Sequence, residues 1–129
     1  MYNYIIVDDE PLIREGTLKK LEPLSSQICC VGEADNGIQA IELIKELHPS
    51  LVILDMEMPV MDGTQLLTYL SENYPTLQLI VISGYKNFDY IKHAISAKVI
   101  DYILKPFTDE QIQETVLEAI SRLQESESI

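Results

Sequence analysis

Basic residues and cysteine are scarce in this chain, and tryptophan is absent. Nine lysines and arginines stand against 21 aspartates and glutamates, which gives a formal net charge of -12. The electrostatic field of such a chain repels DNA, RNA and anionic lipid. We therefore expect no direct contact of this chain with nucleic acid or with a membrane.

Three further absences narrow the class of protein. Cys29 and Cys30 are adjacent and lack the paired spacing and nearby histidines of a zinc site, which predicts plain strand packing for both. No apolar run approaches the ~20 residues of a membrane-spanning helix. The N-terminus lacks a basic segment followed by a long apolar stretch and a cleavage site, so a secretory signal is not expected. These absences predict a cytoplasmic location.

The residues that are present predict one α/β domain. With 129 residues and 47% hydrophobic side chains, the chain is large enough for one independent core. Apolar runs at 3–7, 28–34, 51–54, 77–82 and 100–104 alternate with helical patterns at 10–21, 37–47, 64–74, 87–97 and 108–123. Asp35 or Asn36 is the expected N-cap of the second helix. Parallel neighbours need crossovers, so this alternation predicts a doubly wound, five-stranded parallel sheet in the flavodoxin-like order 2-1-3-4-5.

Four of the five predicted strands end in reactive polar residues. The residues concerned are Asp8 with Asp9, then Asp55, Ser83 and Lys105. The carboxyl ends of parallel strands meet at one edge of the sheet, where ligands of this fold bind. Three carboxylates at that edge repel one another unless a cation neutralises them, and oxygen ligands favour Mg²⁺. The pattern predicts a magnesium and phosphoryl site.

Two prolines mark loops beside this predicted site. Met58-Pro59, followed by Met61-Asp62-Gly63, indicates a tight turn in which Gly63 can adopt a positive φ and a backbone carbonyl can face the metal. The peptide bond between Lys105 and Pro106 can be cis or trans, and the sequence leaves this open.

Taken in order along the chain, these motifs resemble those of the receiver domain of a two-component response regulator. They are Val7-Asp8-Asp9-Glu10, Leu54-Asp55 with Met58-Pro59 and Asp62-Gly63, Ser83, and Asp101-Tyr102 with Lys105-Pro106-Phe107. The resemblance covers residues 3–123. It implies the receiver fold, with residues 1–124 as the receiver domain and residues 125–129 as the beginning of a linker or tail.

The resemblance also implies a role for each site residue. Asp55 accepts a phosphoryl group from a phosphohistidine on a sensor histidine kinase, and Ser83 and Lys105 bind the phosphoryl oxygens. The implied Mg²⁺ ligands are Asp8, Asp9, Asp55 and the backbone carbonyl of Glu57, with Asp9 binding directly and Asp8 through water. Tyr102 together with Ser83 acts as a switch. Such a domain modifies itself and is therefore a signalling domain, not an enzyme.

Family analogy further suggests which surfaces contact partners. The kinase is expected to contact the first helix near Ile13, Arg14 and Thr17. The surface of the fourth helix, fifth strand and fifth helix is expected to change on phosphorylation and to form a homodimer.

Three residues depart from the commonest receiver pattern. Glu57 and Tyr85 flank the expected path of water to the acyl phosphate, so we expect both to modulate its lifetime. Lys98 stands in a turn where relatives often have glycine. If that turn requires a positive φ, Lys98 carries strain of roughly 1 kcal/mol or more. The alternative is a turn rebuilt without a positive φ.

The expected output is transcription. Ser83-Gly84-Tyr85 with Phe88 and Tyr90 resembles receivers joined to arabinose-regulator-type DNA-binding modules, so DNA contact is expected through a C-terminal domain outside this chain. A natural single-domain receiver is the alternative.

Two other functions fit parts of the sequence. Asp55-Met56-Glu57 superficially resembles the Asp-x-Asp motif of Mg²⁺-dependent phosphohydrolases with an aspartyl nucleophile, whose second acid is a general acid and base. Against that function, the second acid here is Glu57 and the motif follows the third strand. A flavin or nucleotide binder of the same fold needs a glycine-rich loop after the first strand, where this chain has Asp8 and Asp9.

Overall fold

A computed structural model describes residues 1–128 as one parallel sheet covered by helices on both faces. The strands are β1 (Tyr2–Val7), β2 (Ile28–Ala34), β3 (Leu51–Asp55), β4 (Gln78–Ser83) and β5 (Asp101–Leu104). The α-helices are α1 (Pro11–Lys20), α2 (Gly37–Leu47), α3 (Gly63–Asn73), α4 (Phe88–Ser96) and α5 (Asp109–Glu127), and a short 3-10 helix covers Glu22–Leu24. The strand order β2-β1-β3-β4-β5 confirms the predicted flavodoxin-like topology.

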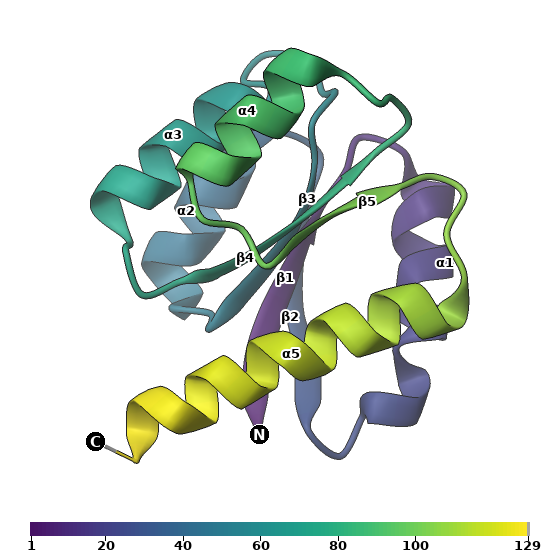
Figure 1. The fold of residues 1–129 in the computed structure, drawn as a ribbon, viewed down its shortest axis with the longest axis vertical. Coiled ribbons are helices and arrows are strands. Elements are labelled where there is room, and N and C mark those ends of the chain that lie inside the picture. Colours follow the sequence, from purple (N-terminus) through teal and green to yellow (C-terminus); the bar gives the residue numbers. More distant parts are fainter. Residues whose placement is uncertain (129) are drawn as a thin grey trace.

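Helices cover both faces of the sheet (Figure 1). An apolar layer lies between the helices and the sheet on each face. On one face, the odd-numbered side chains Ile5 and Val7 of β1 pack with buried residues of α2, α3 and α4. On the other face, Tyr4 and Ile6 pack with the buried stripe of α5 and with Leu21 at the end of α1. Because both faces are covered, the central strands are apolar throughout, which explains their continuous hydrophobic runs.

The strand register brings the polar strand ends to one level. Val7 pairs with Leu54, so Asp8 and Asp55 are the next residues on neighbouring strands. Ile82 pairs with Asp55, and Leu104 pairs with Ser83, so Ser83 and Lys105 each lie one residue further along. The pairing of the strand backbones alone therefore brings these residues to the same edge of the sheet.

Side-chain caps fix where the helices begin. Asn36 is the N-cap of α2, which decides between the two residues that the sequence allowed. Asp62 and Gln65 form a capping box at α3, and Thr108 and Gln111 form one at α5. These caps hold the loops that carry site residues, because they satisfy backbone amides that the first helical turn leaves free.

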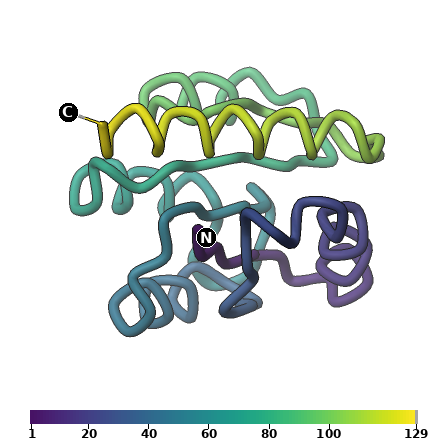
Figure 2. The backbone as a smooth tube through the Cα atoms, turned by 90° about the horizontal axis from the view of Figure 1, so that it is seen from below, coloured from purple at the N-terminus to yellow at the C-terminus, as the bar shows by residue number. Residues whose placement is uncertain are grey.

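The predicted bounds of the elements agree with the structure to within one residue, except at the end of α5. This helix continues to Glu127, so residues 125–127, predicted to begin a linker, are helical. The hydroxyl of Tyr2 donates a hydrogen bond of 2.8 Å to Glu127, which joins the last turn of α5 to β1. Figure 2 shows α5 running along one side of the molecule.

The two cysteines of β2 differ in their exposure. Cys30 is half-buried in β2, but Cys29 is exposed on this edge strand, so the prediction of packing was wrong for Cys29. Among residues 1–128, no helix is both long enough and apolar enough to cross a membrane.

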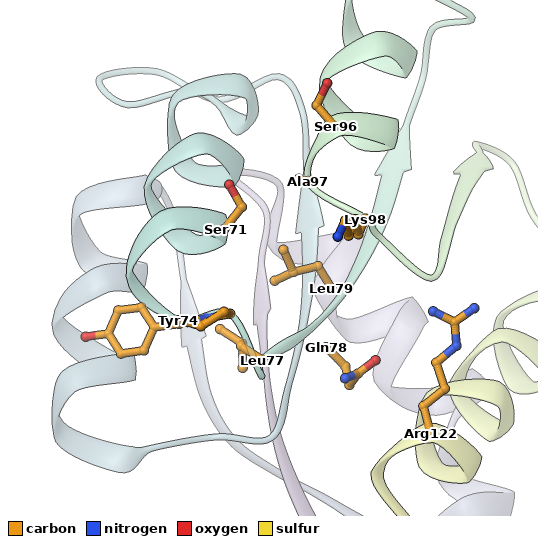
Figure 3. A pocket seen from close by; sticks show the side chains of 10 residues that line it. Ser71, Tyr74, Leu77, Gln78, Leu79, Ser96, Ala97, Lys98 and Arg122 are labelled. Atoms are coloured by element: carbon orange, nitrogen blue, oxygen red, sulfur yellow. The ribbon is translucent and has the colours of Figure 1, made fainter. Parts of the chain in front are cut away.

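The turn after α4 has the strained backbone that the sequence suggested. Lys98 has a φ of 57°, in the left-handed region, as the prediction required. It lies at the rim of a pocket between the ends of α3 and α4, together with Gln78 of β4 and Arg122 of α5 (Figure 3). This pocket lies at the end of the sheet opposite the acidic strand ends, because Gln78 begins β4 and Ser83 ends it.

Replacing Lys98 by glycine is expected to stabilise the protein by about 1 kcal/mol, because glycine adopts a positive φ without a steric penalty. Thermal unfolding should show a melting temperature about 4 °C higher. Lys98→Ala is the matched control, since it removes the ammonium group and keeps the Cβ atom. Equal stability of the two variants would show that φ at this turn has no measurable cost.

Candidate functional site

The acidic strand ends converge as the sequence predicted. Asp8, Asp9 and Asp55 each offer one carboxylate oxygen, and these oxygens all lie within 4.8 Å of one another. Asp8 is 0% exposed and Asp55 is 3% exposed, whereas Asp9 is exposed to solvent. Asp8 and Asp55 therefore lack the solvation that stabilises the charge of a surface carboxylate.

Lys105 supplies the positive charge at this edge. Its Nζ lies 3.0 Å from Oδ2 of Asp8 and 3.4 Å from Oδ1 of Asp55. Glu10 is a weaker neighbour, at 3.9 Å. Burial lowers the pKa of Lys105, but the neighbouring Asp55 and Asp8 raise it by more. The pKa of Lys105 therefore lies above its ordinary value. Lys105 therefore stays protonated while it faces these acids.

The carboxyl group of Asp55 is destabilised in its charged form. Burial and the neighbouring carboxylate of Asp8 raise its pKa from 3.8 to about 6, although Lys105 and a backbone hydrogen bond from Glu57 oppose the shift. One ammonium group does not balance three carboxylates, and the excess negative charge at closely spaced oxygens suits a hard divalent cation. The residues therefore fit a bound Mg²⁺ ion.

An open pocket lies over these carboxylates. Its lining residues are Asp9, Glu10, Asp55, Glu57, Gly84, Tyr85 and Lys105. Glu57 and Tyr85, which the sequence placed beside the path of water, both contribute to the wall. The pocket is polar and open to solvent, so molecules in solution can reach the carboxylates.

Ser83 and Tyr102 meet at one backbone carbonyl. The hydroxyl of Ser83 donates to the carbonyl oxygen of Tyr85 at 3.2 Å and accepts from the amide of Tyr85 at 3.1 Å. The hydroxyl of Tyr102 donates to the same carbonyl oxygen at 2.8 Å. Ser83 is fully buried, and Tyr102 is half-buried beside it. The two residues predicted to switch together are thus joined through the main chain of Tyr85.

The loop after Asp55 differs in detail from the prediction. Val60, not Gly63, has the positive φ, at 70°, and its side chain is 75% exposed. Gly63 begins α3 and is needed for close approach instead. A Cβ atom there would lie 2.4 Å from the Cα of Met56 and 2.7 Å from the carbonyl oxygen of Asp55. The first turn of α3 therefore packs directly against the backbone that carries the acidic site.

Comparison with known families identifies this arrangement. A model of the response regulator receiver domain matches residues 4–117. The chain belongs to the response regulator receiver family. Receiver domains are signalling domains of two-component systems that histidine kinases phosphorylate, and they bind Mg²⁺ in their acidic pocket.

Two bacterial relatives of this chain are longer regulators. The chain is 38% identical over 123 residues to the uncharacterized transcriptional regulatory protein YesN of Bacillus subtilis, a match that covers 95% of this chain and 33% of YesN. It is 34% identical over 129 residues to the transcriptional regulatory protein HptR of Staphylococcus aureus, covering 99% of this chain and 50% of HptR. This receiver domain thus spans between a third and a half of these relatives.

Solved structures show the same fold. The receiver domain of AraT, a response regulator from Geobacillus stearothermophilus, superposes with a TM-score of 0.89 at 34% identity, covering 98% of each chain. A two-component transcriptional regulator AraC from Clostridium phytofermentans gives a TM-score of 0.82 at 28% identity, covering 99% of this chain and 98% of that one.

The structure also corrects the expected kinase-contact residues of this receiver domain. Thr17 is 1% exposed and donates its hydroxyl to the carbonyl of Ile13, so its side chain cannot contact a partner in this conformation. The Arg14 side chain is 14% exposed and bonds to groups at the ends of β1 and β2. The sequence missed these contacts of Arg14, because they join residues far apart in the chain.

Proposed function

We propose that this receiver domain accepts a phosphoryl group on Asp55 from the phosphohistidine of a sensor histidine kinase, in a Mg²⁺-dependent reaction. The observation that carries the proposal is the convergence of Asp8, Asp9 and Asp55 within 4.8 Å. Lys105 lies 3.4 Å from the nucleophilic carboxylate, where it can neutralise phosphoryl charge.

The metal ligands would be the carboxylates of Asp8, Asp9 and Asp55 with the backbone carbonyl of Glu57. When bound, Mg²⁺ supplies positive charge that offsets the carboxylates and the phosphoryl oxygens. Asp55 would then be held in its ionised form, which is the nucleophilic form.

The residues of the chain perform the transfer by position and charge. A carboxylate oxygen of Asp55 forms a bond to phosphorus as the bond from phosphorus to the imidazole nitrogen breaks, and the electron pair stays on nitrogen. Lys105 and the hydroxyl of Ser83 bind the phosphoryl oxygens. A general base is unnecessary, because the attacking carboxylate is already ionised at neutral pH.

The product changes a surface of the receiver. The phosphoryl group adds about -1.5 to -2 charges and strong acceptor oxygens. In the unphosphorylated arrangement the hydroxyl of Ser83 donates to the carbonyl of Tyr85. Turning this hydroxyl toward the phosphoryl group alters the space beside Tyr102, and so biases the surface of α4, β5 and α5 between two states. Formation of a homodimer through α4 and α5 would depend on this change.

The wider role that we propose is control of transcription in the cytoplasm. The receiver domain of residues 1–124 also includes the last turn of α5, which ends at Glu127. A DNA-binding domain of the arabinose-regulator type, outside residues 1–129, contacts DNA. The names of YesN and HptR as transcriptional regulatory proteins support this output. The -12 charge of this chain agrees with leaving DNA contact to another domain.

Phosphorylation with a small-molecule donor tests the function. Incubation with acetyl phosphate and Mg²⁺ should add one phosphoryl group per chain, measured by intact mass spectrometry, and chelation of the metal should abolish the addition. Labelling that is unaffected by chelation, or the absence of labelling, would contradict the proposal.

Turnover separates this function from the phosphohydrolase alternative. A receiver labels itself once and releases phosphate slowly, whereas a hydrolase cycles on organic phosphates such as p-nitrophenyl phosphate. The family assignment favours the receiver. Multiple rapid turnovers without a lasting phosphoprotein would favour the hydrolase.

Glu57 and Tyr85 are expected to set the lifetime of the phosphorylated form in opposite directions. Both line the pocket over Asp55. Glu57→Ala removes a carboxylate that can orient attacking water, so the half-life should lengthen several-fold. Tyr85→Ala opens the pocket to water, so the half-life should shorten. The measurement is loss of phosphoprotein with time after removal of the donor.

Phe88→Ala is the matched control for the aromatic truncation. Phe88 is 82% exposed and does not belong to the pocket lining. The half-life of phosphorylated Phe88→Ala should equal that of the phosphorylated unsubstituted protein. Unchanged half-lives in Glu57→Ala and Tyr85→Ala would remove both residues from a modulating role.

A further inference from the structure

Arg14 of α1 joins the ends of two strands beside the acidic site. Its Nη1 lies 2.6 Å from the carbonyl oxygen of Asp8 and 2.9 Å from a carboxylate oxygen of Asp35. Its Nε lies 3.1 Å from a carboxylate oxygen of Glu33. Three acceptors from two strand ends therefore converge on one guanidinium, and only 14% of the Arg14 side chain is exposed.

The other polar atoms of Asp8 have partners of their own. Its amide donates to the carbonyl of Ala34 at 3.0 Å, Oδ1 accepts from the amide of Glu10 at 2.9 Å, and Oδ2 accepts from Lys105 at 3.0 Å. The carboxylate of Asp8 is thus held without help from Arg14. The contact of Arg14 acts on the peptide unit that follows, which Asp8 shares with Asp9.

Asp9 is the acid that depends on this peptide unit. The carbonyl of Asp8 and the amide of Asp9 belong to one planar group, so fixing the carbonyl also fixes the direction in which the chain enters Asp9. Asp9 is exposed, whereas Asp8 and Asp55 are held by burial and by Lys105. The direction of the backbone sets where the side chain of Asp9 begins, and so whether its carboxylate can reach the other two.

We propose that Arg14 is a positioning residue for the metal site, which orients the peptide between Asp8 and Asp9 so that Asp9 is aligned for Mg²⁺. This inference rests on the proposed function of the acidic site. Groups that orient metal ligands typically contribute a factor of 10 to 100 in metal affinity. The planar fork of arginine can serve a carbonyl and two carboxylates at once, which the ammonium of lysine cannot do with the same geometry.

The sign of the effect separates positioning from simple electrostatics. A guanidinium near the site repels a divalent cation, so removing its charge alone would make Mg²⁺ bind more tightly. Loss of alignment would instead make Mg²⁺ bind more weakly. A purely structural role for Arg14 would lower the melting temperature of the metal-free protein and leave the affinity of the folded protein unchanged.

Calorimetric titration of Mg²⁺ into the phosphoryl-free protein tests the inference. Arg14→Gln should weaken binding about tenfold relative to the unsubstituted chain. Arg14→Lys should weaken it too, because the charge remains but the fork is lost. Arg122→Gln is the matched control, since Arg122 is half-exposed and pairs with Glu118 on α5, and its affinity should not change.

The outcomes separate this inference from the proposed function. Unchanged or tighter Mg²⁺ binding by Arg14→Gln overturns the positioning role while the proposed function stands. If Arg14→Gln does not fold, as judged by circular dichroism, Arg14→Lys decides by the same criterion. Absence of Mg²⁺ binding by the unsubstituted chain overturns both.

Discussion

Replacing Asp55 by asparagine is expected to raise the free energy of unfolding of the metal-free protein at pH 8 by on the order of 2 to 3 kcal/mol. The cause is the raised pKa of this buried carboxyl group, about 6 against an ordinary 3.8. An amide of nearly the same shape has no charge to bury and does not repel Asp8. The same variant should accept no phosphoryl group from acetyl phosphate.

The pH dependence follows from the direction of the pKa shift. Between about pH 4 and pH 7 the folded chain binds a proton at Asp55 that the unfolded chain has released, so the stability of the metal-free protein falls as pH rises. The stability of Asp55→Asn should not show this fall with pH, because asparagine does not titrate. The difference in stability between variant and parent should be small at pH 4 and should reach its full value above pH 7.

Urea unfolding at several pH values, in the presence of a chelator, measures both effects. Asp89→Asn is the control, because Asp89 is exposed in the first turn of α4. Adding Mg²⁺ should stabilise the parent more than Asp55→Asn, which has lost one of the proposed metal ligands. If the variant is less stable than the parent at pH 8, the charge of Asp55 is not a source of instability.

The second large effect is expected from Gly63→Ala, which should destabilise the protein by about 3 kcal/mol or more, the upper end of the range for overpacking. The new Cβ atom would lie 2.4 Å from the Cα of Met56 and 2.7 Å from the carbonyl of Asp55. Both are backbone atoms, which cannot move aside as a side chain can. Displacing them also moves Asp55, the proposed nucleophile, so phosphoryl labelling should fall with stability.

Gly16→Ala provides a matched control for the glycine substitution. Gly16 lies inside α1, and a Cβ atom there would meet nothing within 4 Å. Alanine is the better helix former, so this variant should be more stable by about 0.5 to 1 kcal/mol. Chemical denaturation of both variants gives the comparison. Similar effects of the two substitutions would show that the close approach at Gly63 is relieved at little cost.

The fold could be predicted from the sequence because local and global signals agree. Apolar runs separated by amphipathic helices admit few parallel arrangements, and the polar residues at the strand ends mark one edge. The exception is α5, which extends to Glu127. Its last turn is polar and is held by a hydrogen bond from Tyr2 to Glu127. This contact joins residues far apart in the chain, so the local sequence pattern does not indicate it.

The convergence of the three acidic residues was predicted from the sequence, but the geometry around them was predicted only in part. Asp8, Asp9 and Asp55 follow from the ends of strands and from register, and the structure brings them together. The role of Gly63 was not predicted correctly, because a glycine in a loop signals freedom of φ more readily than close packing. The contacts of Arg14 depend on how α1 lies over β2, and a linear sequence does not show this.

The carbonyl of Tyr85 separates two properties of the receiver that reside at one position. Ser83 and Tyr102 both donate to this main-chain oxygen, while the side chain of Tyr85 lines the pocket. Every amino acid has this carbonyl, so substitutions at position 85 preserve the link between the two hydroxyls. Substitutions at position 85 should consequently reshape the wall of the pocket over Asp55 and leave the hydrogen bonds to the main-chain oxygen in place.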